Sequence, residues 1–221
     1  MVSIAVVGGT GHLGKGIARR LARAGHDVTI GSRAAEKAQA IAKAMDSELG
    51  LTLGFGANRD VVVGKDVVIV TVPYESQKAT LRQIATHVGS AIVVDTTVPL
   101  VPPKVMRVQL PAAGSAAMEA REHLGPDVRF VTAFHNVAAH ILDSDAKVLC
   151  DVLVFSDDIE ARKVIVGLVN EMGLRGLAGG GLANSAAAEA MTSILIYMNK
   201  NYGADGAGIR FTNLTTAPAI P

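Results

Sequence analysis

The sequence predicts an α/β fold in which a doubly wound parallel sheet is covered by helices on both faces. Short runs of aliphatic and β-branched residues alternate along the chain with longer amphipathic stretches. The runs are apolar at nearly every position, which is typical of strands buried on both sides. With 221 residues, of which 49% are hydrophobic, the chain is long enough for one domain with a sizeable core.

Six strands and four helices are expected in the first two thirds of the chain. The helix expected over residues 13–24 carries Leu13, Ile17 and Leu21 on one face. Four prolines between residues 99 and 111 predict a loop there. The strands are expected at residues 2–7, 28–30, 51–55, 67–72, 91–94 and 128–133, and the other helices at residues 34–45, 73–87 and 112–124.

A second, smaller set of elements follows. We expect a strand over residues 151–155, a helix over 159–172, a strand over 174–178, a turn at 179–181 and an apolar helix over 184–200. Met191, Ile194, Leu195 and Met198 share one face of that last helix, as core or interface residues do. The expected division is a larger domain at 1–142, a smaller segment at 143–214 and a frayed tail at 215–221.

Composition excludes several classes of function. The 21 basic and 20 acidic side chains leave a net charge of +1, too little to hold nucleic acid or an anionic membrane. Cys150 is the single cysteine, so a disulfide within the chain and a cysteine-based zinc site are excluded, and no metal site is expected. No apolar run approaches the roughly 18 residues of a membrane span. We therefore expect a cytoplasmic protein.

The stretch from Gly8 to Gly14 is the most informative motif. It contains Gly9-x-Gly11-x-x-Gly14 between the first expected strand and the first expected helix. These glycines allow a tight turn, room for a pyrophosphate against bare backbone, and close packing of helix on strand. The helix that begins here offers free N–H groups to phosphates. The motif in this context predicts a Rossmann-type dinucleotide site.

The end of the second expected strand indicates which dinucleotide binds. NAD sites usually carry an acidic residue there, whereas this chain has Ser32 and Arg33, followed by Lys37 one helical turn later. Asp27 lies at the opposite end of that strand. Residues 1–43 hold seven basic and two acidic side chains, a local charge of +5. A hydroxyl, a guanidinium and an ammonium around one point suit a 2′-phosphate, which predicts NADP(H).

No side chain is assigned as a catalytic acid or base. Ordinary dehydrogenases need a proton donor near the substrate oxygen. The candidates His135, Lys104, Tyr74, His140 and Lys200 fall in no recognisable catalytic arrangement. His135 is the best placed, because it follows the sixth expected strand at the carboxyl edge where open α/β sheets bind ligands.

The residues together resemble the NADPH-dependent coenzyme F420 reductases. The resemblance lies in Gly8–Gly16, Gly31-Ser32-Arg33, residues 71–75, residues 134–139, Asn184-Ser185, and Gly203 with residues 208–211. These motifs occur in order over nearly the whole chain. The first two are widespread among dinucleotide enzymes, and the later ones are more specific.

The resemblance implies hydride transfer between the nicotinamide of NADP(H) and the deazaflavin ring of coenzyme F420, in a homodimer whose C-terminal segment completes the acceptor site and the dimer interface. It also implies roles for particular residues. The NADP(H) contacts would be Gly9, Thr10, Gly11, His12, Leu13, Ser32, Arg33, Lys37, Val72, Pro73 and Ala139. The deazaflavin contacts would be His135 and Val137. Hydride transfer between two conjugated rings needs orientation rather than a side-chain acid, which accounts for the absence of one.

Two departures keep other functions open. Many members carry a basic residue after Asn-Ser, where this chain has Ala186, and a proline shortly after the loop histidine, which is missing here. One alternative is an NADPH-dependent reductase of another planar acceptor, such as a pterin, a flavin or a cyclic imine. The other is a non-enzymatic NADPH-sensing protein that has kept only the nucleotide site.

Overall fold

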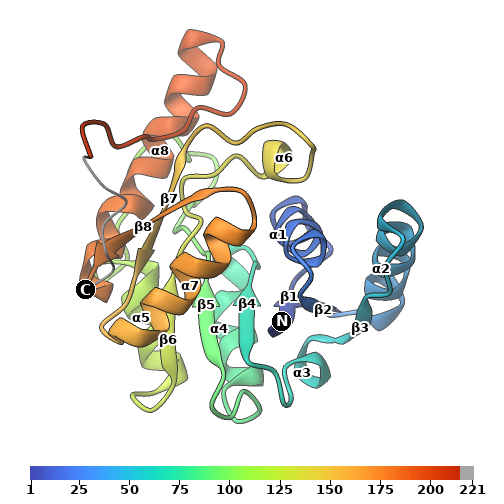
Figure 1. The fold of residues 1–221 in the computed structure, drawn as a ribbon. Helices are drawn as coiled ribbons and strands as arrows, with labels where there is room; N and C mark the ends of the chain where they lie inside the picture. Colours follow the sequence, from blue (N-terminus) through green and yellow to red (C-terminus); the bar gives the residue numbers. More distant parts are fainter. Residues whose placement is uncertain (215–221) are drawn as a thin grey trace.

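The computed structural model describes residues 1–214, and the tail expected at 215–221 lies outside the described residues. Within them one sheet has the strand order β3-β2-β1-β4-β5-β6-β7-β8 (Figure 1). The strands are β1 (Ser3–Val7), β2 (Asp27–Ser32), β3 (Gly54–Ala57), β4 (Val67–Val70), β5 (Ile92–Asp95), β6 (Arg129–Thr132), β7 (Asp151–Phe155) and β8 (Arg175–Gly180). The helices are α1 (His12–Arg23), α2 (Ala35–Leu49), α3 (Asn58–Val61), α4 (Tyr74–Ile84), α5 (Ala116–Leu124), α6 (Ala139–Leu142), α7 (Ile159–Glu171), α8 (Ser185–Tyr202) and the 3₁₀ turn η1 (Leu182–Asn184).

The alternation of side chains along the strands divides the core into two layers. In β1, Ile4 and Val6 pack into a cluster with residues of α1, α2 and α7. Ala5 and Val7 point the other way, into a cluster with α4 and α5. Strands covered on both faces must be apolar at every position, so the predicted α/β fold is confirmed. Among residues 1–214, no helix combines the length and apolar character needed to cross a bilayer.

The strand order places the carboxyl ends of β1 and β4 side by side. Strands β1 to β6 are parallel and follow the Rossmann order, in which the chain reverses direction across the sheet between β1 and β4. The C-terminal strands then extend the same sheet. β7 meets β6 in antiparallel fashion at Thr132 and Phe155, and β8 runs parallel to β7. The pairing of β6 with β7 is therefore the one antiparallel junction in this mostly parallel sheet.

Several elements differ from the sequence expectations. The one-turn helices α3 and α6 and the 3₁₀ turn η1 were not expected, because a single turn is too short to show a helical period. Gly179 and Gly180 belong to β8 instead of a turn. Helix α5 begins at Ala116, later than expected, where the hydroxyl of the cap residue Ser115 accepts a hydrogen bond from the N–H of Met118 at 3.1 Å.

Helix α1 is also joined to the segment that leads into β7. The Arg20 guanidinium donates hydrogen bonds to the carbonyl oxygens of Leu142, Ser144 and Ala146 at 2.9–3.0 Å. Gly16 permits this close approach: a Cβ there would lie 2.7 Å from the Asp143 nitrogen and from the Leu142 carbonyl carbon. Both of those atoms are backbone and cannot move aside cheaply.

This contact predicts opposite effects for two glycine-to-alanine changes. We expect Gly16→Ala to lower the free energy of unfolding by about 1–3 kcal/mol, because the new methyl group overpacks the junction of α1 and α6. Gly167→Ala, in α7, meets nothing within 4 Å and should raise it by about 0.5–1 kcal/mol through helix propensity. Urea unfolding of both variants measures the two changes. A neutral or stabilising Gly16→Ala would contradict the described packing.

Candidate functional site

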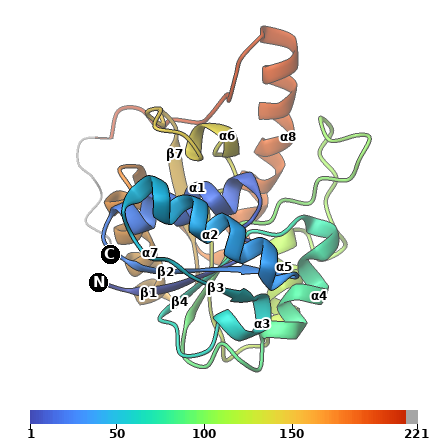
Figure 2. The ribbon, with the colours of Figure 1, turned by 90° about the vertical axis from the view of Figure 1, so that its right-hand side faces the viewer.

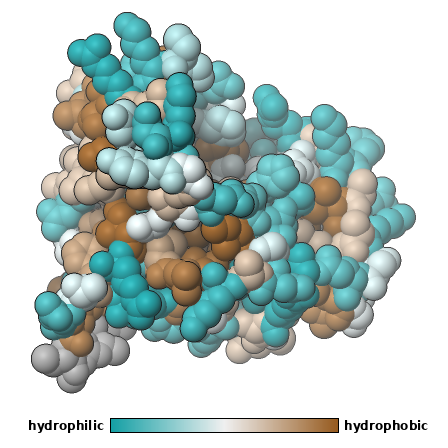
Figure 3. All heavy atoms as spheres, turned by 90° about the horizontal axis from the view of Figure 1, so that it is seen from above, coloured by the Kyte–Doolittle hydropathy of each residue, from teal (hydrophilic) through white to brown (hydrophobic). Residues whose placement is uncertain are grey.

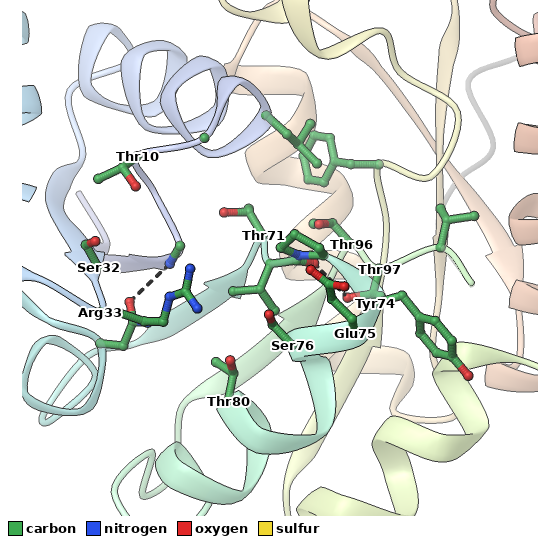
Figure 4. A pocket seen from close by; sticks show the side chains of 18 of the residues that line it. Thr10, Ser32, Arg33, Thr71, Tyr74, Glu75, Ser76, Thr80, Thr96 and Thr97 are labelled. Atoms are coloured by element: carbon green, nitrogen blue, oxygen red, sulfur yellow. Dashed lines mark hydrogen bonds between the residues drawn. The ribbon is translucent and has the colours of Figure 1, made fainter. Parts of the chain in front are cut away.

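A cavity of about 590 Å³ opens at the carboxyl edge of the sheet. Its wall comes from the loop after β1, the end of β2, the start of α3, the segments that follow β4 and β5, and the turn after β6. Ligands bind in this place in open α/β sheets. Figure 4 shows Thr10, Ser32 and Arg33 on one side of the cavity and Thr71, Thr96, Thr97 and Tyr74 on the other. Seen from above, the surface mixes hydrophobic and hydrophilic residues (Figure 3).

The glycine-rich turn after β1 is packed so closely that side chains are excluded. A Cβ on Gly14 would lie 2.6 Å from the Thr71 hydroxyl oxygen and 2.7 Å from the Gly9 Cα. The N–H of Gly9 donates to the Gly31 carbonyl at 2.9 Å, and the N–H of Gly8 donates to the Asn58 side-chain oxygen at 3.1 Å. Helix α1 starts without a side-chain cap and without an acidic residue in its first turn. Its first N–H groups and its dipole therefore favour an anion.

The rim beside the end of β2 is cationic. Arg33 and Lys37 both line the cavity and are exposed. Among residues 1–214, neither takes part in an ion pair. Ser32, the last residue of β2, also lines the cavity, and its hydroxyl accepts a hydrogen bond from the Ala34 N–H at 3.4 Å. Two cations without an ion-pair partner and a hydroxyl with one long hydrogen bond together suit a phosphate group.

The other basic residues near the N-terminus have a different role. Arg19, Arg20 and Arg23 of α1 contact Glu48, Asp145 and the carbonyls of residues 142–146. Lys15 pairs with Asp143 at 2.9 Å. Most of the basic side chains in residues 1–43 therefore hold α1 against α2 and against residues 142–146. Of these basic residues, only Arg33 and Lys37 line the cavity.

The opposite side of the cavity includes a group of mostly apolar residues, one of which has a strained backbone. It contains Val72, Pro73, Phe134, His135 and Val137. Phe134 has a φ of 67°, a left-handed conformation that side-chain-bearing residues rarely adopt and that concentrates at functional sites. Burial lowers the pKa of His135 to about 4, so its imidazole is neutral at neutral pH. Both ring nitrogens are buried and lack a hydrogen-bond partner within the described residues.

Most of the residues assigned through the resemblance come together around this cavity. Its lining includes Thr10, Gly11, Leu13, Ser32, Arg33, Lys37, Val72, Pro73, His135 and Val137. Gly9, His12 and Ala139 do not belong to the lining. Gly9 packs under the turn, against the Val6 carbonyl and Ile30. The His12 side chain is 74% exposed and faces Asp143 at 3.4 Å, and Ala139 opens α6.

Several lining residues were not foreseen from the sequence. Thr71, Thr96 and Thr97 follow the ends of β4 and β5, a position that could have drawn attention to them because ligands bind at that edge. Asn58 follows the short strand β3, whose two glycines give a weak strand signal. Only the folded chain shows that Asn58 holds the glycine-rich turn through the Gly8 N–H.

The proton-donor candidates do not converge on the cavity. Of the five, Tyr74 and His135 line it, and Lys104, His140 and Lys200 do not. The Tyr74 hydroxyl donates to Glu119 at 2.7 Å. Burial and the adjacent carboxylate raise the pKa of Tyr74 to about 12, so it holds its proton firmly. The cavity therefore offers places for flat ligands and anions, and the Glu75 carboxylate also belongs to its lining (Figure 4).

Comparison with known proteins gives consistent matches. Residues 3–99 match the family described as NADP oxidoreductase, coenzyme F420-dependent. F420-dependent NADP reductases from Methanocaldococcus jannaschii and Methanothermobacter thermautotrophicus are 39% and 37% identical, over 96% and 97% of this chain and 99% and 96% of theirs. A crystal structure from Arthrobacter of a proposed F420-dependent NADP reductase aligns with a TM-score of 0.79 and 21% identity, covering 96% of this chain and 100% of that one.

The cationic rim predicts a specific change in cofactor preference. Arg33→Ala should weaken NADPH binding about tenfold and leave NADH binding nearly unchanged, because a charge-assisted bond to the 2′-phosphate is lost. Lys43→Ala is the control, since Lys43 is exposed on α2, the helix that follows Arg33, but lies outside the cavity lining. Fluorescence titration with both nucleotides measures the ratio. Equal losses for NADPH and NADH would remove Arg33 from the 2′-phosphate site.

Proposed function

Because this chain belongs to the family of F420-dependent NADP reductases, we propose that it transfers a hydride between NADP(H) and coenzyme F420. It is an oxidoreductase with these two small-molecule partners. The structural observation that supports this function is one continuous cavity. It runs from the glycine-rich turn and the Arg33–Lys37 rim to the apolar residues around His135. One end suits a phosphorylated dinucleotide and the other a flat ring.

The residues present fit the dinucleotide. The backbone at Gly9 and Gly14 is too closely packed to bear side chains, which leaves bare N–H groups at the start of α1 for a pyrophosphate. We assign Thr10, Gly11 and Leu13 to this contact. Ser32, Arg33 and Lys37 hold the 2′-phosphate. Val72 and Pro73, directly after β4, position the nicotinamide end.

The acceptor side is assigned to the turn after β6. His135 is buried, neutral and without a hydrogen-bond partner in the described residues, and it belongs to the cavity lining. Val137 and Phe134 form the adjacent apolar wall. We assign His135 and Val137 to the deazaflavin ring. Residues 1–142 would then hold NADP(H) and most of this wall, and residues 143–214 would support the wall from behind.

The chain contributes to the reaction by orienting the two rings and by keeping water away from them. When bound, the nicotinamide and the deazaflavin supply the redox chemistry, with C4 of one ring exchanging a hydride with C5 of the other. Val72, Pro73 and Val137 exclude water from the space between the rings. His135 stays neutral and Tyr74 keeps its proton, so neither adds charge to the site. The proton needed to balance reduction of the deazaflavin comes from solvent. We also propose a cytoplasmic location, which the use of two small-molecule carriers supports.

An acceptor assay tests the function. Purified protein with NADPH and F420 should bleach the deazaflavin absorbance, and NADP with reduced F420 should restore it. NADH should support a much lower rate. Turnover of a dihydropterin, a flavin or a cyclic imine with no turnover of F420 would select another planar acceptor. Tight NADPH binding with no turnover of any acceptor would select an NADPH-sensing role.

We also propose that the protein is a homodimer formed through α8. The helix projects beyond the sheet in two perpendicular views (Figures 1 and 2). Met191, Ile194 and Met198 share one face of it and are 36%, 42% and 39% exposed. Beside that face lies an apolar groove of about 430 Å³, lined by Leu153, Leu177 and Met191 among others. Because Met191 belongs to both surfaces, one two-fold contact with a second copy can cover both.

If α8 forms the dimer interface, a charged residue on its apolar face should disrupt the dimer. Ile194→Asp should convert the dimer to a monomer, because it places a carboxylate in the apolar contact. Val164→Asp in α7 is the matched control, since Val164 is also 42% exposed, and it should remain dimeric. Sedimentation equilibrium at micromolar concentration measures both. A monomeric wild-type protein, or a dimeric Ile194→Asp variant, would remove α8 from the interface.

A further inference from the structure

Asp95 is a buried carboxyl group immediately behind the cavity that the proposed function does not use. It is the last residue of β5 and is 1% exposed. A buried carboxylate costs several kcal/mol of desolvation unless hydrogen bonds compensate it. Its position at the carboxyl end of a central strand is the position from which such sheets contact ligands. Asp95 therefore calls for an explanation beyond packing.

Two side-chain donors converge on this carboxyl group. The Gln77 side-chain amide donates to Oδ2 at 2.5 Å, and the Thr97 hydroxyl donates to Oδ1 at 2.7 Å. The backbone N–H groups of Thr96 and Thr97 also contribute. Burial raises the pKa of Asp95 to about 6 while these hydrogen bonds oppose the rise, so the group is ionised at neutral pH. An ionised carboxylate accepts hydrogen bonds only, which forces the Thr97 proton towards Asp95.

Gln77 is held in one orientation by a second contact. It is 1% exposed, and its amide nitrogen also donates to the Ala116 carbonyl at 3.3 Å. The N–H groups of Ala116 and Ala117 in turn donate to the Glu189 carboxyl group at 2.7 and 3.0 Å. Hydrogen bonds thus join Glu189 of α8 to the start of α5, the start of α5 to Gln77 of α4, and Gln77 to Asp95. The direction of the Thr97 hydroxyl is set by buried groups on three helices.

The consequence lies in what Thr97 offers to the cavity. Thr97 lines the cavity and is 3% exposed. Since its proton is committed, only lone pairs remain for a ligand. The neighbouring hydroxyls of Thr71 and Thr96 donate to the carbonyls of Val7 and Val70 at 2.9 and 3.0 Å. The three threonines, which Figure 4 shows on the same side of the cavity, form an edge that accepts hydrogen bonds.

We propose that Thr97 orients a reacting ring by accepting a hydrogen bond from its amide N–H, with Asp95 and Gln77 as positioning residues that fix the hydroxyl. The proposal rests on the proposed function, because both proposed ligands carry such a group. The carboxamide of nicotinamide and the imide of the deazaflavin pyrimidine ring share this chemistry. A ring that presents a carbonyl oxygen to Thr97 would be rejected, because two acceptors would face each other.

Three threonine variants test the contact. Thr97→Val removes the hydroxyl at constant shape and should weaken the contacted ligand about tenfold, whereas Thr97→Ser should stay within about twofold of wild type. Thr29→Val is the control, a threonine 9% exposed in β2 and outside the cavity lining. The readouts are the Kd for NADPH by fluorescence titration, the KM for F420, and kcat. Thermal unfolding reports stability, and Thr97→Ala replaces Thr97→Val if that variant does not fold.

The pattern of losses identifies the ring. A higher Kd for NADPH assigns the nicotinamide carboxamide, and a higher KM for F420 with unchanged NADPH binding assigns the deazaflavin imide. Unchanged values for both, or equal losses for Thr97→Ser and Thr97→Val, would overturn the proposal. Absence of F420 turnover by the wild-type protein would refute the proposed function instead, and the NADPH titration would still report on Thr97.

A double-mutant cycle tests the role of Asp95. Asp95→Asn should weaken the same ligand in the wild-type background and have no further effect in the Thr97→Val background, because Asp95 acts through that hydroxyl. A general structural effect would instead lower affinity by the same factor in both backgrounds. Either that additive result or no effect of Asp95→Asn on its own would remove Asp95 as a positioning residue.

Discussion

The close approach of bare backbone at Gly9 and Gly14 is the constraint on which the rest of the site depends. At this point α1, β4 and the turn after β1 meet at distances that leave no room for a Cβ. Thr71 completes the junction by donating from its hydroxyl to the Val7 carbonyl. Because the turn is fixed by packing and by Asn58, the uncapped start of α1 is held in place without help from a ligand. A preorganised anion site of this kind costs little ordering on binding.

The charges of the molecule are divided between structure and recognition. The arginines of α1 donate hydrogen bonds to carbonyl oxygens and pair with a carboxylate of the segment that leads to β7. Arg33 and Lys37, two and six residues after Gly31, are left to face the cavity. The same composition that gives a net charge of +1 thus gives a locally cationic rim. Net charge excludes broad polyanion binding but says little about a single phosphate site.

Local patterns in the sequence predict the sheet well because buried parallel strands have a strong signature. Residues 67–70, where every position is buried, show why β4 was easy to recognise. Short sequence patterns predict secondary structure less well. The helices α3 and α6 are single turns, and the sequence predicts a turn at Gly179 and Gly180, which instead end β8. The antiparallel junction of β6 and β7 rests on one residue pair, Thr132 and Phe155, which no periodicity encodes.

The candidate site divides in the same way. The glycine motif and the Ser32–Arg33 pair are contiguous in sequence and were found there. Asn58, Gln77 and Asp95 act on residues brought close only by folding, since Asn58 and Gly8 lie 50 positions apart. Buried polar groups of this kind look like solvent-exposed residues in a sequence. Their hydrogen bonds must be complete in the fold, which makes them the most informative residues once the fold is known.

A reaction without a side-chain acid places unusual weight on such groups. Neither the neutral His135 nor Tyr74, which keeps its proton, is assigned as an acid or base, so the proposed reaction depends on the relative placement of two rings. Apolar walls define the plane of a ring but not its rotation within that plane. A hydroxyl with a fixed proton supplies that missing coordinate, because a single directional acceptor favours one edge of the ring. The buried Asp95 is then the cost of directional control at this edge of the cavity.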